Sequence, residues 1–455
     1  MEYFKNILKD EYRRHQYLID SLPEIDKAYY HRIITNQASE VDYEQSLKKL
    51  SAYLAEFHHS KVIILIDEYD TPINSAYSNG FYSKAIQFVR GIMEGAFKDN
   101  EYLEKGVITG ILRVAKEGIF SGLNNLSVYS ILSTRCADKF GFTPAEVSQL
   151  LQDFNQQSFT EAIQTWYDGY LFGNHQVIYN PWSILNYLNN PDDGLRPYWV
   201  NTSDNQLLKR YLFHHRNNRE IRQALSDLVQ GKTVKAQHVY EHLVFPDLDQ
   251  NIRFLWNFLL FGGYLKALNQ RMQGIYIIHD LALPNQEVRY LYETFILEWV
   301  EQQVQREDLS LLLNALTQGR VDLLEKKLKI FAEQVFSYHD TQGKEPESFY
   351  HAFILGLLVS LDYSHEIKSN REAGYGRYDI LLTPRDTTQL GIIIELKNAE
   401  EEDDLEKMAI TALTQIEQKN YAAELRQRGI PQVFKIGMAT RGKEVWMKAL
   451  IEPLV

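Results

Sequence analysis

Cysteine is almost absent from this chain of 455 residues, since Cys136 is the only one. A single cysteine excludes internal disulfides and any metal site built from several cysteines, as expected for a reducing compartment. No apolar run approaches the ~20 residues that a membrane span needs. The N-terminal segment MEYFKNILKDEYRRHQ also lacks the apolar core of a signal peptide. We therefore expect a cytoplasmic protein that does not cross a membrane.

The chain also lacks repeats and low-complexity stretches, so domain boundaries must come from changes of pattern. With 45% hydrophobic and 24% charged residues it has the composition of a globular protein, and its length predicts two or three domains. A net charge of −12 argues against broad electrostatic attraction to nucleic acid. A local basic groove remains compatible with that charge.

The N-terminal part predicts an α/β unit. Residues 1–58 have helical spacing, and the short β-rich run KVIILIDEYD has the pattern of a buried parallel strand. A helix over YSKAIQFVRGIMEGAF and a second strand over GVITGIL follow. The first strand ends in Asp67 and Glu68, and in nucleotide hydrolases such a pair places an Asp for Mg²⁺ and a Glu for the attacking water.

From about 145 to 335 the pattern is mostly helical, as in PAEVSQLLQDF, PWSILNYL and LYETFILEWVEQQVQ. After HDTQGKEPES the order becomes helix, three strands, a long helix and two more strands. We interpret this part as a separate α/β domain of ~110 residues.

Three charged residues in this last domain lie where core residues would be expected. Glu395 and Lys397 share one face of a strand, and an antiparallel hairpin would bring Asp379 opposite them. Two carboxylates at one end of a hairpin favour a hard divalent cation between them. A lysine beside that cation can activate water or stabilise charge on a phosphate.

Residues on the neighbouring helices fit the same site. Gln415 shares a helix face with Lys419, and Glu347 lies at the start of FYHAFILGLL, from where it could reach the metal. Each has an ordinary alternative, because Glu347 is also a favourable acid at a helix N-terminus and Lys419 a solvated charge. The order of Glu, Asp, Glu-x-Lys and Gln along these elements is more specific than any of its members.

With these residues in that order, the domain resembles the PD-(D/E)XK nuclease superfamily. The text FYHAFILGLL...GRYDILL...IIIELK...ALTQIEQKNY is similar to the nuclease-like domain of a group of bacterial proteins that also carry an AAA-ATPase-like domain. The resemblance implies a restriction-endonuclease-like α/β fold, Mg²⁺ or Mn²⁺ bound by Asp379 and Glu395, and Lys397 assisting phosphodiester hydrolysis. Glu347 and Gln415 complete the implied catalytic set.

The text KVIILIDEYDTPI...GVITGILRVAKEGIF...WYDGY...YNPWSIL resembles the AAA-ATPase-like domain of the same group, a P-loop-NTPase-like α/β fold. By that likeness Asp67, Glu68, Thr109 and Arg113 form a remnant nucleotide site. We predict this domain over residues 1–200, a helical connecting region over 201–338 and the nuclease-like domain over 339–455.

No G-x-x-x-x-G-K-[ST] phosphate loop is found in the sequence. The Gly-Lys-Thr at 231–233 follows a helical run and lacks the first glycine, so we reject it as a phosphate loop. We expect a family member that begins after its phosphate loop, with ATP bound weakly or not at all and Asp67 and Glu68 without present chemistry.

Two functions remain open. The first is a metal-dependent nuclease, with DNA favoured as substrate, attached to a degenerate ATPase module. The segment from Lys344 to the end carries 14 Lys+Arg and 18 Asp+Glu, a net charge of −4, so Arg371, Arg377, Lys397 and Lys419 must supply the local positive field. The second is an inactive scaffold, whose helical middle region binds a protein partner or another copy of the chain.

Overall fold

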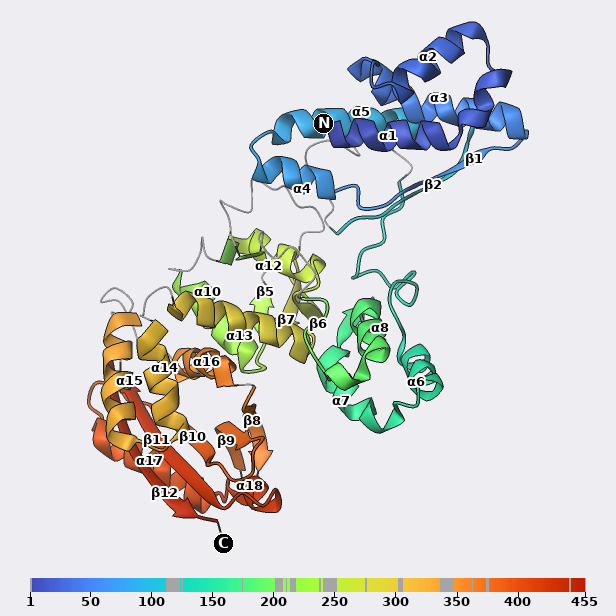
Figure 1. Ribbon diagram of the computed structural model, residues 1–455. Helices are drawn as coiled ribbons and strands as arrows, with labels where there is room; N and C mark the ends of the chain where they lie inside the picture. Colours follow the sequence, from blue (N-terminus) through green and yellow to red (C-terminus); the bar gives the residue numbers. More distant parts are fainter. Residues whose placement is uncertain are drawn as a thin grey trace. The chain divides into compact units, whose positions relative to one another are not determined.

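The computed structural model divides into two compact units. It describes residues 2–111, 123, 126–173, 175–200, 208–209, 211–212, 218–236, 239, 252–274, 276–301, 306–335, 347–361, 363–373, 376–441 and 443–454. Unit 1 comprises Met1–Arg135 and Gln237–Gly263, and unit 2 comprises Cys136–Ala236 and Tyr264–Val455 (Figure 1). Within the part of the chain that the structure describes, no helix is both long and apolar enough to span a membrane.

Unit 1 is a helical bundle with a small parallel sheet. Its helices are α1 Glu2–Arg14, α2 Glu24–Ile34, α3 Glu40–His58, α4 Thr71–Ser78, α5 Tyr82–Phe97 and α12 Ile252–Phe261, and its strands are β1 Val62–Ile66 and β2 Leu103–Ile108. Helix α3 begins at a capping box, in which Ser39 and Asp42 each accept the other's main-chain N–H. The sequence did not predict α4, which begins directly after the acidic end of β1.

Tyrosines form much of the bundle's core. Tyr12 and Tyr30 are fully buried, and each hydroxyl has a main-chain acceptor: Tyr12 donates to the carbonyl of Ser46 at 2.7 Å and Tyr30 to that of Tyr12 at 2.6 Å. A buried hydroxyl with such an acceptor avoids the cost of leaving a polar group unsatisfied.

Strands β1 and β2 pair in parallel, with Ile66 opposite Ile108, as the sequence predicted for this α/β unit. One face of the pair is exposed. Ile63 is 61% and Leu65 72% exposed on β1, and Val107 is 39% exposed on β2.

The described residues of unit 2 form several helices and three sheets. The helices are α6 Pro144–Asp153, α7 Thr160–Tyr167, α8 Pro181–Asn189, α10 Arg219–Val229, α13 Gln286–Glu301, α14 Arg306–Thr317, α15 Val321–Val335, α16 Glu347–Leu358, α17 Leu405–Gln418 and α18 Ala423–Gln427. The strands are β3 Tyr170–Phe172, β4 Gln176–Ile178, β5 Val234–Ala236, β6 Lys266–Gln273, β7 Tyr276–Ala282, β8 His365–Ala373, β9 Gly376–Pro384, β10 Gly391–Asn398, β11 Gln432–Arg441 and β12 Glu444–Pro453.

The middle of the chain is less helical than the sequence predicts. Strands β3 and β4 form a hairpin, and β5, β7 and β6 form a three-stranded antiparallel sheet. Strand β6 is exposed over most of its length, so it lacks the apolar alternation by which a strand is found in a sequence. Gly231 and Lys232 lie in the turn between α10 and β5, which confirms that 231–233 is not a phosphate loop.

The C-terminal part of unit 2 is built on a five-stranded sheet in the order β12-β11-β10-β9-β8 (Figure 1). The β9–β10 and β8–β9 pairs are antiparallel, and β10 pairs with β11 in parallel across the connection that contains α17. Ile392 and Ile394 project from one face of β10, and Ile393 and Glu395 from the other, where Ile393 packs in a core with Ile416 of α17. The predicted α/β class is confirmed.

Candidate metal centre of the C-terminal sheet

The site lies where strands β9 and β10 separate. Their ladder pairs Ile392 with Leu382, Ile393 with Leu381 and Ile394 with Ile380, and the paired residues end there. One step further, the main-chain N–H of Leu396 donates to Oδ2 of Asp379 at 2.8 Å. The Asp379 carboxylate thus lies between the two strands. It is close to Glu395 and Lys397, the residues on either side of Leu396.

Glu395 is buried beneath α17. Its side chain is 2% exposed, and its Oε1 accepts from Nε2 of Gln415 and lies 3.5 Å from Nζ of Lys397. Its Oε2 is buried and has no hydrogen-bond partner among the described residues. Burial first, and the charge of Asp379 second, raise the pKa of Glu395 to about 8, although Lys397 opposes the shift. Burial therefore favours the protonated form of this carboxyl group, whereas a bound cation would favour its charged form.

A glycine lets α17 approach Glu395 closely. Gly437 of β11 is the direct neighbour of Glu395 in the parallel ladder. A Cβ at Gly437 would lie 2.3 Å from the carbonyl oxygen of Ala409 and 2.4 Å from the main-chain nitrogen of Leu413, both in α17. Any larger residue would have to move the helix that carries Gln415.

The end of α17 belongs to the same arrangement. Nε2 of Gln415 lies 3.3 Å from the hydroxyl of Tyr421, a buried residue in the turn before α18. Lys419 caps the C-terminal end of α17, directly after Gln418, and is exposed. Gln415 therefore reaches Glu395, whereas Lys419 lies at the solvent-exposed end of the helix.

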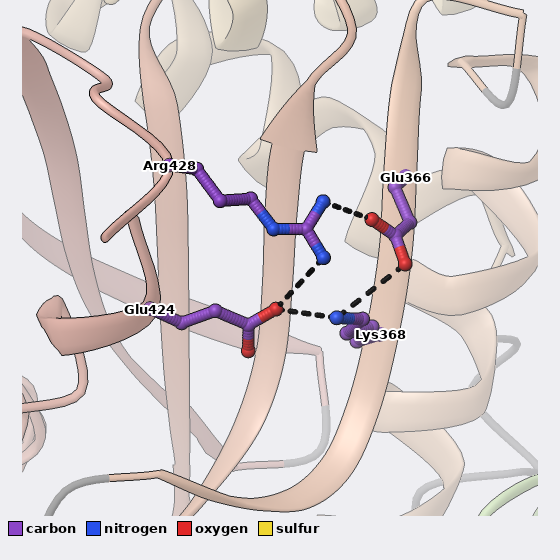
Figure 2. Close-up of polar contacts among 4 residues, drawn as sticks. All are labelled: Glu366, Lys368, Glu424 and Arg428. Atoms are coloured by element: carbon purple, nitrogen blue, oxygen red, sulfur yellow. Dashed lines mark hydrogen bonds and ion pairs between the residues drawn. The ribbon is translucent and has the colours of Figure 1, made fainter. Parts of the chain in front are cut away.

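Four charged residues fasten α18 to the edge strand β8 (Figure 2). Acids and bases alternate around a closed ring that runs from Glu366 to Lys368 of β8, on to Glu424 and Arg428 of the α18 region, and back to Glu366; the Lys368–Glu366 and Arg428–Glu424 distances are 3.4 and 3.2 Å. Lys368 is paired with Leu381, which packs with Leu425 of α18, so the ring lies on the face of the sheet that carries Glu395. The ring helps to fix the segment that contains Tyr421.

His351 of α16 contacts strand β9, the strand that carries Asp379. The imidazole is 3% exposed, and its Nε2 lies 3.0 Å from the main-chain carbonyl oxygen of Asp379. Burial lowers the pKa of His351 to about 4, so the ring is neutral at physiological pH. A ring nitrogen that faces a carbonyl oxygen must carry the hydrogen, which identifies the tautomer as Nε2–H.

The residues present fit a divalent cation. Carboxylate oxygens are the ligands that Mg²⁺ and Mn²⁺ prefer, and a buried carboxylate oxygen without a partner, Oε2 of Glu395, is what such an ion would engage. Asp379 and Glu395 form a pair; among the described residues no group of three or more His, Cys, Asp or Glu side chains could hold a metal ion. Helix α16 begins at Glu347, whose side chain lies outside the described part of the structure.

Comparison with known proteins gives the same division of the chain. Residues 345–450 match the family model described as "PD-(D/E)XK nuclease superfamily", and residues 3–120 match the one described as "Predicted AAA-ATPase". The chain carries both domains. A relative described as "Uncharacterized protein in vnfD 5'region", from Azotobacter chroococcum mcd 1, is 24% identical over 383 residues, which cover 82% of this chain and 68% of the relative. The resemblance predicted from the sequence is confirmed.

In the AAA-ATPase-like domain the predicted acids lie together but in the open. Asp67 and Glu68 directly follow β1 and are exposed. The hydroxyl of Thr109, at the end of β2, donates to Oδ1 of Asp67, and the main-chain N–H of Glu68 lies 3.3 Å from the same hydroxyl. Arg113 lies outside the described residues. Thr109 therefore contacts Asp67 without enclosing it, and the nucleotide-binding roles of these residues stay predictions.

Some residues of the PD-(D/E)XK domain's site were missed from the sequence. The sequence does not single out His351, because a single histidine in an apolar helix is ordinary, although it lies one turn after Glu347. Gly437, inside an apolar strand, carried a usable signal, since such a glycine indicates close approach of another backbone.

Proposed function

We propose that the PD-(D/E)XK domain hydrolyses phosphodiester bonds of nucleic acid with the help of Mg²⁺ or Mn²⁺ bound at Asp379 and Glu395. The observation that carries the proposal is the buried Glu395 carboxyl group, whose Oε2 lacks a partner among the described residues while Asp379 is held beside it. Burying an acid in this way is unfavourable unless a ligand compensates for the lost hydration. A divalent cation is the ligand that the pair of carboxylates fits.

The side chains divide the work of such a reaction. When bound, the cation would act as a Lewis acid toward the phosphate and the attacking water. Asp379 and Glu395 would hold it, and Gln415 orients Glu395 by donating to Oε1. Lys397, 26% exposed at the rim of the site, can donate to the water or to a phosphate oxygen.

Nucleic acid, with DNA favoured, is the substrate class that we infer for a cytoplasmic, bacterial protein of this kind. Lys397 supplies positive charge at the site and Lys419 is exposed at the end of α17, whereas the side chains of Arg371 and Arg377 lie outside the described residues. Each lysine that contacts a phosphate adds to affinity in a manner that salt weakens.

For the AAA-ATPase-like domain we propose a scaffold role, without ATP hydrolysis in this chain, in which it binds a protein partner or a second copy. The exposure of Asp67 and Glu68 supports this proposal, because hydrated carboxylates on a two-stranded sheet lack the enclosed site in which nucleotide chemistry is accelerated.

Cleavage of supercoiled plasmid, single-stranded DNA and RNA by the full chain, with and without Mg²⁺ or Mn²⁺, tests the nuclease. Asp379→Asn and Lys397→Ala should each reduce metal-dependent cleavage by about 10²–10³-fold, the usual cost of losing one such group. Asp386→Asn is the matched control, since Asp386 lies in the turn at the other end of the same hairpin and accepts from Thr388. Equal cleavage by all four proteins would refute the mechanism and leave the scaffold as the function of both domains.

A further inference from the structure

The main chain at Asp379 is held from both sides. Beyond the Ile380–Ile394 pair, the N–H of Leu396 is taken by the Asp379 carboxylate at 2.8 Å instead of by a main-chain carbonyl. The carbonyl of Asp379 itself accepts from His351 Nε2 at 3.0 Å. Two hydrogen bonds that involve side chains therefore define the point at which the strands separate and the carboxylates meet.

His351 is well placed to act as a fixed support. It lies in α16, whose Gly356 packs so closely on α13 that a Cβ there would be 2.7 Å from Cγ2 of Ile296. Tyr350, Phe353 and Ile354, which surround His351 in the helix, are also buried. A helix packed in this way offers its imidazole N–H to the strand at a constant position.

On this geometry, we propose that His351 is a positioning residue of the metal centre: its Nε2–H fixes the Asp379 main chain and thereby aims the Asp379 carboxylate. The inference rests on the proposed function, because it assigns His351 a task only if Asp379 binds a cation. Partners of this kind, which orient a metal ligand without touching the metal, commonly change metal affinity by about 10–100-fold.

The competing explanation is a core histidine that merely satisfies a buried carbonyl. The two explanations differ in what they require of a replacement. If His351 is only a core residue, a replacement of similar volume without a hydrogen-bond donor is tolerated at some cost in stability. If His351 is a positioning residue, the replacement must carry an N–H at the ε position. Gln and Met form a matched pair, since both are long and unbranched and only Gln carries that donor.

The test is Mn²⁺ affinity, measured by electron paramagnetic resonance on the full chain, for wild type, His351→Gln and His351→Met. Urea denaturation of each variant, followed by circular dichroism, establishes that it is folded. We expect His351→Met to weaken Mn²⁺ binding by about 10–100-fold and to raise the Mn²⁺ concentration for half-maximal cleavage in parallel. His351→Gln should retain most of the wild-type affinity.

The outcomes separate the two proposals. If wild type binds Mn²⁺ and the Gln and Met variants bind it equally well, the positioning role is wrong and the nuclease proposal stands. If wild type binds no Mn²⁺, the proposed function fails and the role of His351 fails with it. If His351→Met does not fold, His351→Phe replaces it in the same comparison, because Phe retains a planar ring and lacks the donor.

Discussion

The chain contains two strands that lead into acidic residues, and the structure treats them in opposite ways. Asp67 and Glu68 directly follow strand β1 and are exposed, whereas Glu395 of β10 is 2% exposed. In the described residues β1 has one neighbour, β2, while β10 lies between β9 and β11 beneath α17. Acids at the end of a strand are therefore hydrated in one unit, whereas in the other unit Glu395 is desolvated.

The difference matters because burial changes what a carboxylate can do. Desolvation and a second carboxylate raise the pKa of Glu395, so the protonated form is favoured, and a bound cation would instead favour the charged form. Exposed acids are already hydrated and gain less from binding a metal ion. A strand ending in acids becomes a site only when neighbouring strands and a helix enclose it.

The largest effect on stability that we expect comes from the charge of Glu395. Its pKa rises from 4.5 to about 8 on folding, so between these values the native protein keeps a proton that the unfolded chain has released. The unfolding free energy of the metal-free chain should therefore fall as pH rises from about 5 to about 9, on the order of a few kcal/mol at about 1.4 kcal/mol per pKa unit. Urea denaturation across this range measures it.

Glu395→Gln provides the control for that prediction, because an amide does not ionise. In this variant the decline with pH should largely disappear, and Mg²⁺ should no longer protect the chain at high pH. A decline that is identical in wild type and Glu395→Gln would show that another group is responsible.

Two glycines test how closely helices approach the strands in each unit. A Cβ at Gly437 would meet main-chain atoms of α17, whereas a Cβ at Gly106 of β2 would lie 2.5 Å from a ring carbon of Phe97, a side chain that can rotate. Gly437→Ala should therefore cost about 1–3 kcal/mol, measured by urea denaturation, and also weaken Mn²⁺ binding by displacing Gln415. Gly106→Ala should cost less and leave Mn²⁺ binding unchanged. The reverse order would contradict the close packing described for α17.

The smallest effect is expected on the exposed face of β1. Leu65 is 72% exposed, so Leu65→Thr should change the unfolding free energy by no more than about 0.5 kcal/mol. Ile393→Thr, at a fully buried position of β10, should cost about 2–4 kcal/mol. Equal costs, measured in the same denaturation series, would mean that another surface covers Leu65 in solution.

Much of the C-terminal domain could be predicted because its strands are long and apolar. Residue alternation predicted the order of helix, three strands, helix and strand. It also predicted the β9–β10 hairpin and the approach of Asp379 to Glu395. The end of α17 could not be predicted in this way. The sequence continues in a helical pattern beyond it, but Asn420 adopts a φ of 53° and starts a new segment. Sequence periodicity does not reveal a single residue in the left-handed region.

Contacts between distant elements were beyond the reach of the sequence. The bond from His351 to the carbonyl of Asp379 joins residues 28 positions apart and involves main chain, which carries no residue identity. The ring formed by Glu366, Lys368, Glu424 and Arg428 depends on how the α18 region packs across β8, and no local pattern encodes that position. The domain boundaries and the catalytic roles stay predictions.

Mn²⁺ binding to the full chain tests the central claim most directly, because it compares the two acidic pairs in one molecule. Electron paramagnetic resonance titrations of wild type, the double variant Asp379→Asn/Glu395→Gln and the double variant Asp67→Asn/Glu68→Gln give the comparison. We predict that the first double variant loses tight Mn²⁺ binding and that the second retains it. Retention in the first, or loss in the second alone, would contradict the assignment of the metal centre to the two carboxylates of the C-terminal sheet, Asp379 and the buried Glu395.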